Sequence, residues 1–387
     1  MSRGREEVIS KLPIDIIFDI FSRLPLKTIS ECRWVSKKWY ALIRNPSFIK
    51  LHHARALENN SCYVIFDCWW GGFSLLDNES STETLATSYE IKFTDFLGYS
   101  LPFSKFNSRV VGMVNGLICF DHYNLCVIRN PTSEHRLTFY IFNPIMGDYI
   151  RLPLSPMHSR MDLSENGASG FGFDSLNNEY KVVWIYRNPL EYTNDVEVYT
   201  LGSDKWRVIT SNVPYISGIR KSCVLFKNSL HWVAYIRGKP CTTNVILSFN
   251  LAKEEFSIIQ LPPQFDIGFC DELRCLVALG KHLCFINGRV PGALEIWVMK
   301  EYGVKGSWVK EYGVRRESIR RPIQFSEMIE LSNGEFLLFN HLKGICYYDP
   351  HKKASKLFEI YCKDKSVDYE PMFLAGSLFS PKNVGYY

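Results

Sequence analysis

Side chains able to do chemistry are numerous in this chain, but almost none of them recur at the spacing that a reaction requires. The sequence has nine histidines and twelve cysteines, yet it contains no C-x-x-C pair and no H-E-x-x-H motif. A G-x-S-x-G motif and a Walker loop are also missing. These patterns place metal ligands, an activated serine or phosphate-binding amides side by side. We therefore expect no catalytic residue, no metal and no cofactor.

Two short motifs invite a chemical interpretation but fit a structural one better. The stretch "GASGFGFD" at Gly167–Asp174 lacks the third glycine of a dinucleotide-binding loop, and a strand pattern follows where a helix is needed. We expect a turn that enters a strand. His52 and His53 are adjacent. Successive side chains on a helix diverge by about 100°, which makes this pair a poor metal chelate. We expect a solvated helix end there.

Four cysteines lie inside apolar runs, which indicates buried free thiols in a reducing compartment. They are Cys119, Cys223, Cys284 and Cys346. The first ten residues, "MSRGREEVIS", lack the apolar segment of a secretory signal. No apolar run reaches the roughly 18 residues of a membrane helix. We expect a cytoplasmic or nuclear location, or both, with no membrane partner.

The charge balance is mildly basic. The 45 basic and 40 acidic residues leave a net charge of +5 on 387 residues, which does not indicate nucleic acid as a partner. Basic side chains concentrate at "VRRESIRRP", Val314–Pro322. This stretch is either a solvated loop or a contact for an acidic target. Trp69 and Trp70 point to opposite faces of a predicted strand, so one of them is a second candidate for a target contact.

The segment "KLPIDIIFDIFSRLPLKT", Lys11–Thr28, has the periodicity of a helix that is apolar around most of its circumference. One row at helical spacing comprises Ile14, Ile17, Phe18 and Phe21, and a second comprises Ile16, Ile20 and Leu24. Pro25 ends this helix, and in the next helical stretch Ser36 caps a break and Pro46 marks the end. Two or three short helices cannot bury so much apolar surface alone. The rest of the chain or a partner protein must cover it.

After about residue 60, short strands separated by turn residues replace the helices. Five strand pairs share an aromatic, a neighbouring polar or β-branched residue and a short polar loop. Their aromatics are Phe142, Tyr199, Phe249, Trp297 and Tyr348, spaced by 57, 50, 48 and 51 residues. A period near 50 predicts four-stranded propeller blades of the kelch size class, with room for about six. We expect the first unit to pair with the last apolar strand, "PMFLAGSLF". The alternative is a β-sandwich or an irregular barrel.

The N-terminal segment "LPIDIIFDIFSRLPLKTISECRWVSKKWYALIRNPSFIKLHH" resembles an F-box. The later stretches "NGLICF", "FNPIMGDYIRLP", "GFGFDSLNNEYKVV" and "VEVYTLGSDKWRVI" are similar to the plant F-box-associated domain, in the class that includes S-locus F-box-like proteins. Kelch repeats carry a double glycine in each blade, but here the sole pair is Gly71–Gly72, so the kelch likeness is loose. We expect an all-α F-box at 10–50, a linker at 51–60 and an all-β, kelch-like propeller at 61–375, with a flexible tail at 1–9 and a second tail at 376–387.

The resemblance implies the substrate-recognition subunit of an SCF-type ubiquitin ligase, which is not itself an enzyme. One helical face would bind a Skp-type adaptor and through it a cullin–RING ligase, and propeller loops would bind a protein target that the sequence does not identify. By position, the implied adaptor-facing residues are Leu12, Pro13, Ile16, Ile17, Ile20, Leu24, Pro25, Ile29 and Val35. Packing against the propeller is the alternative for each of them, while Trp39 is expected to be internal. A propeller enzyme, a small-molecule sensor and an F-box protein that acts outside ubiquitin transfer stay open.

Overall fold

The computed structural model describes the helical N-terminal region and most strands of the region that follows. The described residues are 12–24, 26–58, 62–68, 72–77, 94–95, 108–123, 137–156, 167–188, 193–209, 214, 216, 218–237, 242–265, 274–289, 293–315, 325–330, 334–340, 344–359, 371–375 and 377–383. Of the sequence motifs named above, Trp69, Trp70 and most of the arginine-rich stretch lie outside these residues.

Four helices precede the first strand in the described residues. They are α2 (Ile14–Ser22), α3 (Leu26–Cys32), α4 (Lys37–Ile43) and α5 (Pro46–Glu58). Ser36 separates α3 from α4 as expected: its Oγ accepts a hydrogen bond from the Trp39 amide at 3.3 Å and so caps α4. Helix α5 continues through most of residues 51–60, which were expected to be a linker. None of the described helices is long and apolar enough to cross a bilayer.

The described strands form six four-stranded antiparallel sheets. Three sheets contain β1 (Cys62–Cys68), β2 (Gly72–Asp77), β3 (Thr94–Asp95) and β24 (Pro371–Ala375); β4 (Ser108–Val114), β5 (Leu117–Tyr123), β6 (Leu137–Asn143) and β7 (Asp148–Arg151); and β8 (Ala168–Asp174), β9 (Glu179–Asn188), β10 (Thr193–Thr200) and β11 (Arg207–Ile209). The other three contain β12 (Gly218–Phe226), β13 (Ser229–Arg237), β14 (Thr242–Asn250) and β15 (Glu255–Gln260); β16 (Arg274–Leu279), β17 (His282–Asn287), β18 (Ala293–Met299) and β19 (Trp308–Arg315); and β20 (Phe325–Glu330), β21 (Phe336–Asn340), β22 (Gly344–Asp349) and β23 (Ala354–Glu359). The structure therefore has a few short helices followed by antiparallel sheets, as predicted for an all-α segment that precedes an all-β region.

One strand from each sheet lies against its counterparts in the neighbouring sheets. Contacts join β4 to β8, β8 to β12, β12 to β16, β16 to β20, β20 to β24, and β24 to β4. Strand β24 also pairs antiparallel with β1, with Phe373 opposite Val64. This is the pairing between the first and last strands that the sequence predicts.

A repeated turn explains the repeated aromatic motif. Asn143, Asn250 and Asp349 are each the last residue of the third strand of a sheet, and each follows an aromatic residue. The side-chain oxygen of each accepts hydrogen bonds from the backbone amides two and three residues later, at 2.8–3.1 Å. Asn and Asp favour such turns because the side chain replaces a backbone acceptor. The motif therefore marks the turn into the fourth strand.

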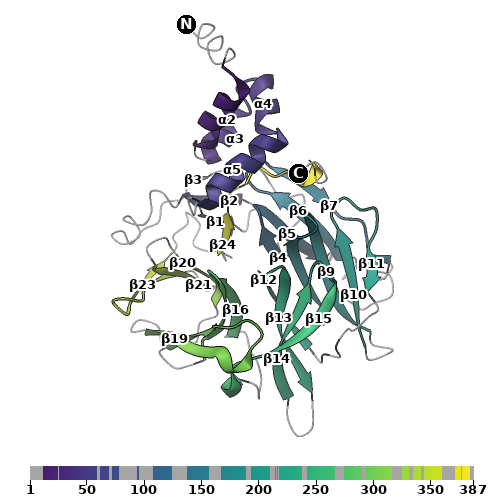
Figure 1. The fold of residues 1–387 in the computed structure, drawn as a ribbon, viewed down its shortest axis with the longest axis vertical. Helices are drawn as coiled ribbons and strands as arrows, with labels where there is room; N and C mark the ends of the chain where they lie inside the picture. The colour runs from purple at the N-terminus through teal and green to yellow at the C-terminus, as the bar shows by residue number, and fades with distance from the viewer. Residues whose placement is uncertain are drawn as a thin grey trace, which may run out of the picture.

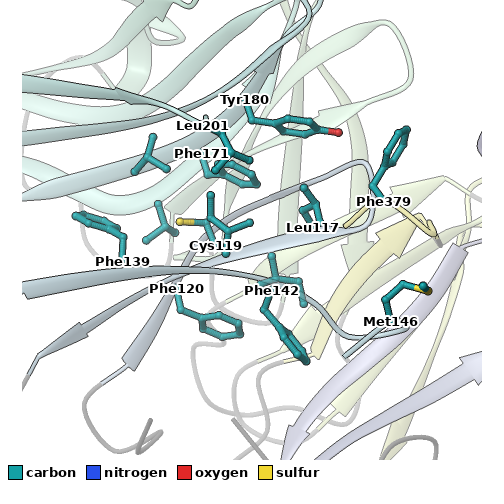
Figure 2. Close-up of a cluster of buried hydrophobic side chains, with 14 of the residues drawn as sticks. Leu117, Cys119, Phe120, Phe139, Phe142, Met146, Phe171, Tyr180, Leu201 and Phe379 are labelled. Carbon is teal, nitrogen blue, oxygen red and sulfur yellow. The ribbon is translucent and has the colours of Figure 1, made fainter. Parts of the chain in front are cut away.

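One apolar core is shared by the helices and the sheets. Phe21, Ile29 and Phe48 from the helices belong to the same buried cluster as Leu117 and Phe142 from the β4–β7 sheet. Figure 2 shows the part of this cluster formed by the sheets and by Phe379 from the C-terminal end. The helices gather at one end of the β region, beside β6, β7 and the C-terminus (Figure 1). The helical region is therefore packed onto the β region through a continuous apolar core.

Candidate functional site

The helices expose an apolar surface on the side away from the shared core. On α2 and just before it, Leu12, Ile14, Ile16 and Ile20 are 37–56% exposed, and after α3 Trp34 is 72% exposed. We define the exposed helical face by its members, which are Leu12, Pro13, Ile14, Ile16, Ile20, Trp34, Val35 and Tyr40. Scattered exposed apolar residues are ordinary, but several large ones within this short helical region, with Ile16 and Ile20 one turn apart on α2, indicate an interaction surface.

The opposite side of α2 explains how this face is held. Phe21 packs against Trp39 at 4.8 Å between ring centroids, and Phe18 packs against Phe48 at 5.3 Å. The polar stripe of α2 is also fixed, since Asp19 accepts hydrogen bonds from Arg23 and from Arg55 of α5. These bonds, that from Arg23 first, lower the pKa of Asp19 and keep its carboxylate charged. The exposed row is thus carried on a helix with a fixed orientation.

Two arginines tie the exposed aromatics to the β region. The guanidinium of Arg33 lies 4.9 Å from the centroid of the Trp34 ring and donates to the Met146 carbonyl at 2.6 Å. The guanidinium of Arg44 lies 4.8 Å from the Tyr40 ring centroid and 2.9 Å from Asp148 Oδ2. Arginine suits both tasks because its planar group stacks on rings and donates in several directions.

The structure divides the residues implied to face an adaptor. Leu12, Pro13, Ile16, Ile20 and Val35 are exposed. Ile17 and Leu24 are half-buried and pack against the shared core.

Ile29 is 0% exposed and belongs to that core, so we omit it from the exposed helical face. Pro25 lies outside the described residues. Ile14, Trp34 and Tyr40 were not among the implied residues. Both apolar rows of α2 look alike in sequence. In the structure Ile16 and Ile20 of the second row are exposed, as is Ile14 at the start of the first row, while the rest of the first row packs inward. Trp39 is half-buried and packs against the core.

Two sequence motifs have structural roles. "GASGFGFD" forms β8 itself, and a Cβ on Gly170 would lie 2.6 Å from Trp232 Cζ2 of the neighbouring sheet. This glycine therefore permits close packing between sheets. The expectation of a solvated helix end at His52 is wrong, because His52 is 4% exposed and packs beside Phe48 inside the shared core. Burial lowers its pKa to about 4.

The prediction of buried thiols at four cysteines is confirmed in part. Cys119 and Cys284 are free and buried, Cys346 is buried, and Cys223 is free and of intermediate exposure. Burial raises the pKa of Cys119 and of Cys284, which leaves these thiols protonated and unreactive. They act as small apolar core residues.

Polar groups buried in the β region bond across the boundaries between sheets. Lys181 of β9 donates to the Leu251 carbonyl at 2.7 Å and lies 3.1 Å from Glu254 and 3.3 Å from Asp174. Burial alone would lower the pKa of Lys181, but these two carboxylates outweigh it and raise the pKa. Leu251 and Glu254 lie in the turn between β14 and β15, so this network joins the β8–β11 sheet to the β12–β15 sheet.

A second buried group joins the next pair of sheets. His231 Nε2 of β13 lies 2.7 Å from Tyr302 Oη and 3.2 Å from Ser248 Oγ. Tyr302 follows β18 of the neighbouring sheet. Burial lowers the pKa of His231 to about 4, so the imidazole is neutral at pH 7. Within the described residues, no group of three or more His, Cys, Asp or Glu side chains is arranged to hold a metal ion.

Comparison with known proteins agrees with this division into helices and sheets. Residues 9–51 match the F-box domain, and residues 59–371 match the F-box associated beta propeller domain. The second match covers most of the chain. The chain belongs to the F-box associated β-propeller family.

Named plant relatives align with this chain over most of their length. The chain is 29% identical over 366 residues to "F-box protein CPR1" of Arabidopsis thaliana, covering 85% of this chain and 82% of that one. It is 28% identical over 322 residues to "F-box protein DOR" of the same plant, covering 79% and 75%. These relatives are consistent with a plant F-box protein.

Among solved structures, an alpha-L-arabinanase of Penicillium chrysogenum is similar at 11% identity. That likeness covers 66% of this chain and 80% of the arabinanase, with a TM-score of 0.44. A likeness of this degree has no bearing on activity.

Proposed function

We propose that this F-box protein is the substrate-recognition subunit of an SCF-type ubiquitin ligase. Its exposed helical face binds a Skp-type adaptor, and its β domain binds a protein target. The observation that carries the proposal is the exposed helical face on a segment that matches the F-box domain. Eight apolar or aromatic residues on α2, on α4 and in the segments beside the helices cost free energy while they face water, and a protein partner removes that cost.

We propose further that the six sheets are the blades of a closed propeller. The cyclic contacts among β4, β8, β12, β16, β20 and β24 support closure, as does the pairing of β24 with β1. A closed ring leaves no sheet face uncovered between neighbours, which suits a rigid binding scaffold.

The positions of the short turns indicate which end of the propeller binds the target. The turn between β6 and β7 contacts the helices through Met146 and Asp148. The turn between β8 and β9 and the turn between β12 and β13 are bonded to each other through Asp174 and Asn228, and a bond from Asn115 reaches Tyr180 beside them. Short turns thus share one end, and β5, β7 and β15 finish at the other end, where 13, 16 and 13 residues of sequence separate them from the next strand. We assign target binding to that other end, because longer loops more often carry binding residues.

The subunit's contribution to ubiquitin transfer is proximity and does not require an active site in this chain. It holds a target lysine near the charged ligase and so raises the effective concentration of the two reactants. The buried polar groups at Lys181 and His231 are bonded across sheet boundaries, which favours a structural role for them over catalysis in a propeller enzyme.

Auto-ubiquitination tests the proposal without knowledge of the target. The full chain is assembled with a purified Skp-type adaptor and a cullin–RING ligase, and transfer of ubiquitin to its own lysines is followed with and without the adaptor. We expect adaptor-dependent transfer that is lost in a Leu12→Ala/Pro13→Ala variant. A chain that binds the adaptor but receives no ubiquitin would place the protein outside ubiquitin transfer, and a chain that does not bind would overturn the proposal.

A further inference from the structure

The residues after the last strand lie between the helices and the β region. We define the C-terminal segment as residues 377–383. Ser377, Leu378, Phe379 and Ser380 are at most 8% exposed, although they follow β24, the last strand of the described residues, in the stretch expected to be a tail. Leu378 and Phe379 belong to the core that the helices share with the β4–β7 sheet, and Phe379 lies in the cluster with Leu117 and Phe142 (Figure 2). A segment that follows the last strand of a domain is usually exposed unless something holds it.

One side chain of the β4–β7 sheet holds the C-terminal segment in place. Asn143 Nδ2 donates to the Ser377 carbonyl at 2.9 Å and to the Phe379 carbonyl at 2.5 Å. Its Oδ1 accepts from the amides of Ile145 and Met146, which forms the turn into β7. The amide group of Asn143 is completely buried and has partners on both its oxygen and its nitrogen. It therefore couples the turn to the C-terminal segment.

The helices contact both the C-terminal segment and the start of β7, which the segment also approaches. The ring of His53 in α5 packs edge-on against Phe379 at 5.0 Å between centroids. Asp148, which begins β7, pairs with Arg44 at 2.9 Å and lies 3.8 Å from Lys382 Nζ. The 3-10 turn η7 (Pro381–Asn383) contacts β6 and β7. Figure 1 shows this end of the chain beside α5 and β7.

We infer that the C-terminal segment fixes the position of the helices on the β4–β7 sheet. Asn143 is the positioning residue that holds this segment. The exposed helical face then has one orientation relative to the β domain. If the proposed function holds, that orientation sets the distance between the adaptor and the bound target, which ubiquitin transfer requires to be short. This structural role of the C-terminal segment does not depend on the identity of the target.

A conservative substitution separates the two roles of Asn143. Asn143→Asp keeps the acceptor for the Ile145 and Met146 amides but replaces the donor with a carboxylate facing two carbonyl oxygens. Asn250→Asp is the matched control, because Asn250 makes the same turn in the β12–β15 sheet with the Ala252 and Lys253 amides. Both variants should fold, and only the first should release the C-terminal segment.

The readout is the distance between spin labels introduced as noncanonical amino acids at Lys38 of α4 and Val309 of β19, both exposed. We expect a single narrow distance distribution in the unsubstituted chain and in the control, Asn250→Asp, and loss of that narrow distribution in Asn143→Asp. Phe379→Ala, with Phe256→Ala as its control, repeats the test from the segment's side. Folded Asn143→Asp and Phe379→Ala variants that keep the narrow distribution would overturn the inference.

Adaptor binding by the same variants keeps this inference distinct from the proposed function. Retained adaptor binding together with a lost narrow distribution is the expected result. An unsubstituted chain that does not bind the adaptor would contradict the proposed function, while the distance measurement on the free chain would still decide the role of the C-terminal segment.

Discussion

Two histidines are buried in a neutral form, one in the helical region and one in the β domain. Burial lowers the pKa of His52 and of His231 to about 4, against an ordinary value of 6.5. In the unfolded chain both would bind a proton as the pH falls through 6.5, whereas the folded chain binds it only near pH 4. Acidification from pH 6.5 to pH 4 therefore favours the unfolded state. Above pH 6.5 both histidines are neutral in either state, and the folded state keeps its full stability.

The free energy of unfolding should fall as the pH is lowered from 6.5 toward 4, by up to about 1.4 kcal/mol per pH unit for each buried histidine. In His231→Gln the fall should be shallower, because glutamine keeps hydrogen-bonding capacity near Tyr302 and Ser248 but does not titrate. Urea unfolding at several pH values, compared between the two proteins, measures the difference. Parallel curves from pH 7 to pH 4 would show that His231 does not contribute.

Contacts between neighbouring sheets depend on a glycine in β8 and on two tryptophans at or just before the start of fourth strands. A Cβ on Gly170 would also lie 2.9 Å from Leu230 Cδ1, so β8 approaches β13 more closely than any larger residue permits. Trp206 Nε1 donates to the Pro153 carbonyl at 2.7 Å, and Trp308 Nε1 donates to the Gln260 carbonyl at 3.0 Å. Each tryptophan thus bonds to the chain at or just beyond the end of the fourth strand of the preceding sheet.

Gly170→Ala should lower the free energy of unfolding by about 1–3 kcal/mol, because the added methyl forces Trp232 or Leu230 to move in a packed core. Gly313→Ala is the matched control in β19, where an added Cβ meets nothing within 4 Å. Its effect should stay within about 0.5 kcal/mol. Denaturant unfolding of both variants measures these changes, and equal effects would contradict the packing role of Gly170.

Local patterns were readable from the sequence, and contacts between distant segments were not. The pairs Phe142–Asn143 and Phe249–Asn250 mark strand ends because the turn is made by the Asn side chain itself. The cap at Ser36 is equally local. By contrast, Ile29 and Ile16 are both apolar helical residues, and only the core shared by the helices and the sheets distinguishes the buried one from the exposed one. His52 became a core residue for the same reason.

At the scale of the whole molecule, the proposed closed propeller requires that the first and last described strands be joined. Cys62 of β1 lies directly opposite Ala375 of β24 in the strand register. Directly opposed residues in an antiparallel pair have Cα atoms about 4.5–5.5 Å apart, within the range that a disulfide spans. The two strands come from opposite ends of the β domain, so their pairing supports the proposed closure.

An Ala375→Cys variant should therefore form a disulfide with Cys62 under mild oxidation. Peptide mapping by mass spectrometry identifies the cross-linked pair among the other cysteines, and non-reducing electrophoresis shows the change in mobility. The control is Cys62→Ser/Ala375→Cys, which should give no such cross-link. Absence of a disulfide-linked peptide joining Cys62 to position 375 in the oxidised, folded Ala375→Cys variant would contradict the proposed closure of the propeller.

The most direct measurement is the affinity of the full chain for a purified Skp-type adaptor by titration calorimetry. We predict that the unsubstituted chain binds and that Ile16→Asp binds at least about tenfold more weakly, because a carboxylate must lose its water at a buried apolar contact. Leu176→Asp, the same change at a 77% exposed leucine in the turn between β8 and β9, should bind like the unsubstituted chain. Equal affinity of all three, or no binding by the unsubstituted chain, would contradict an adaptor-binding role for the exposed helical face.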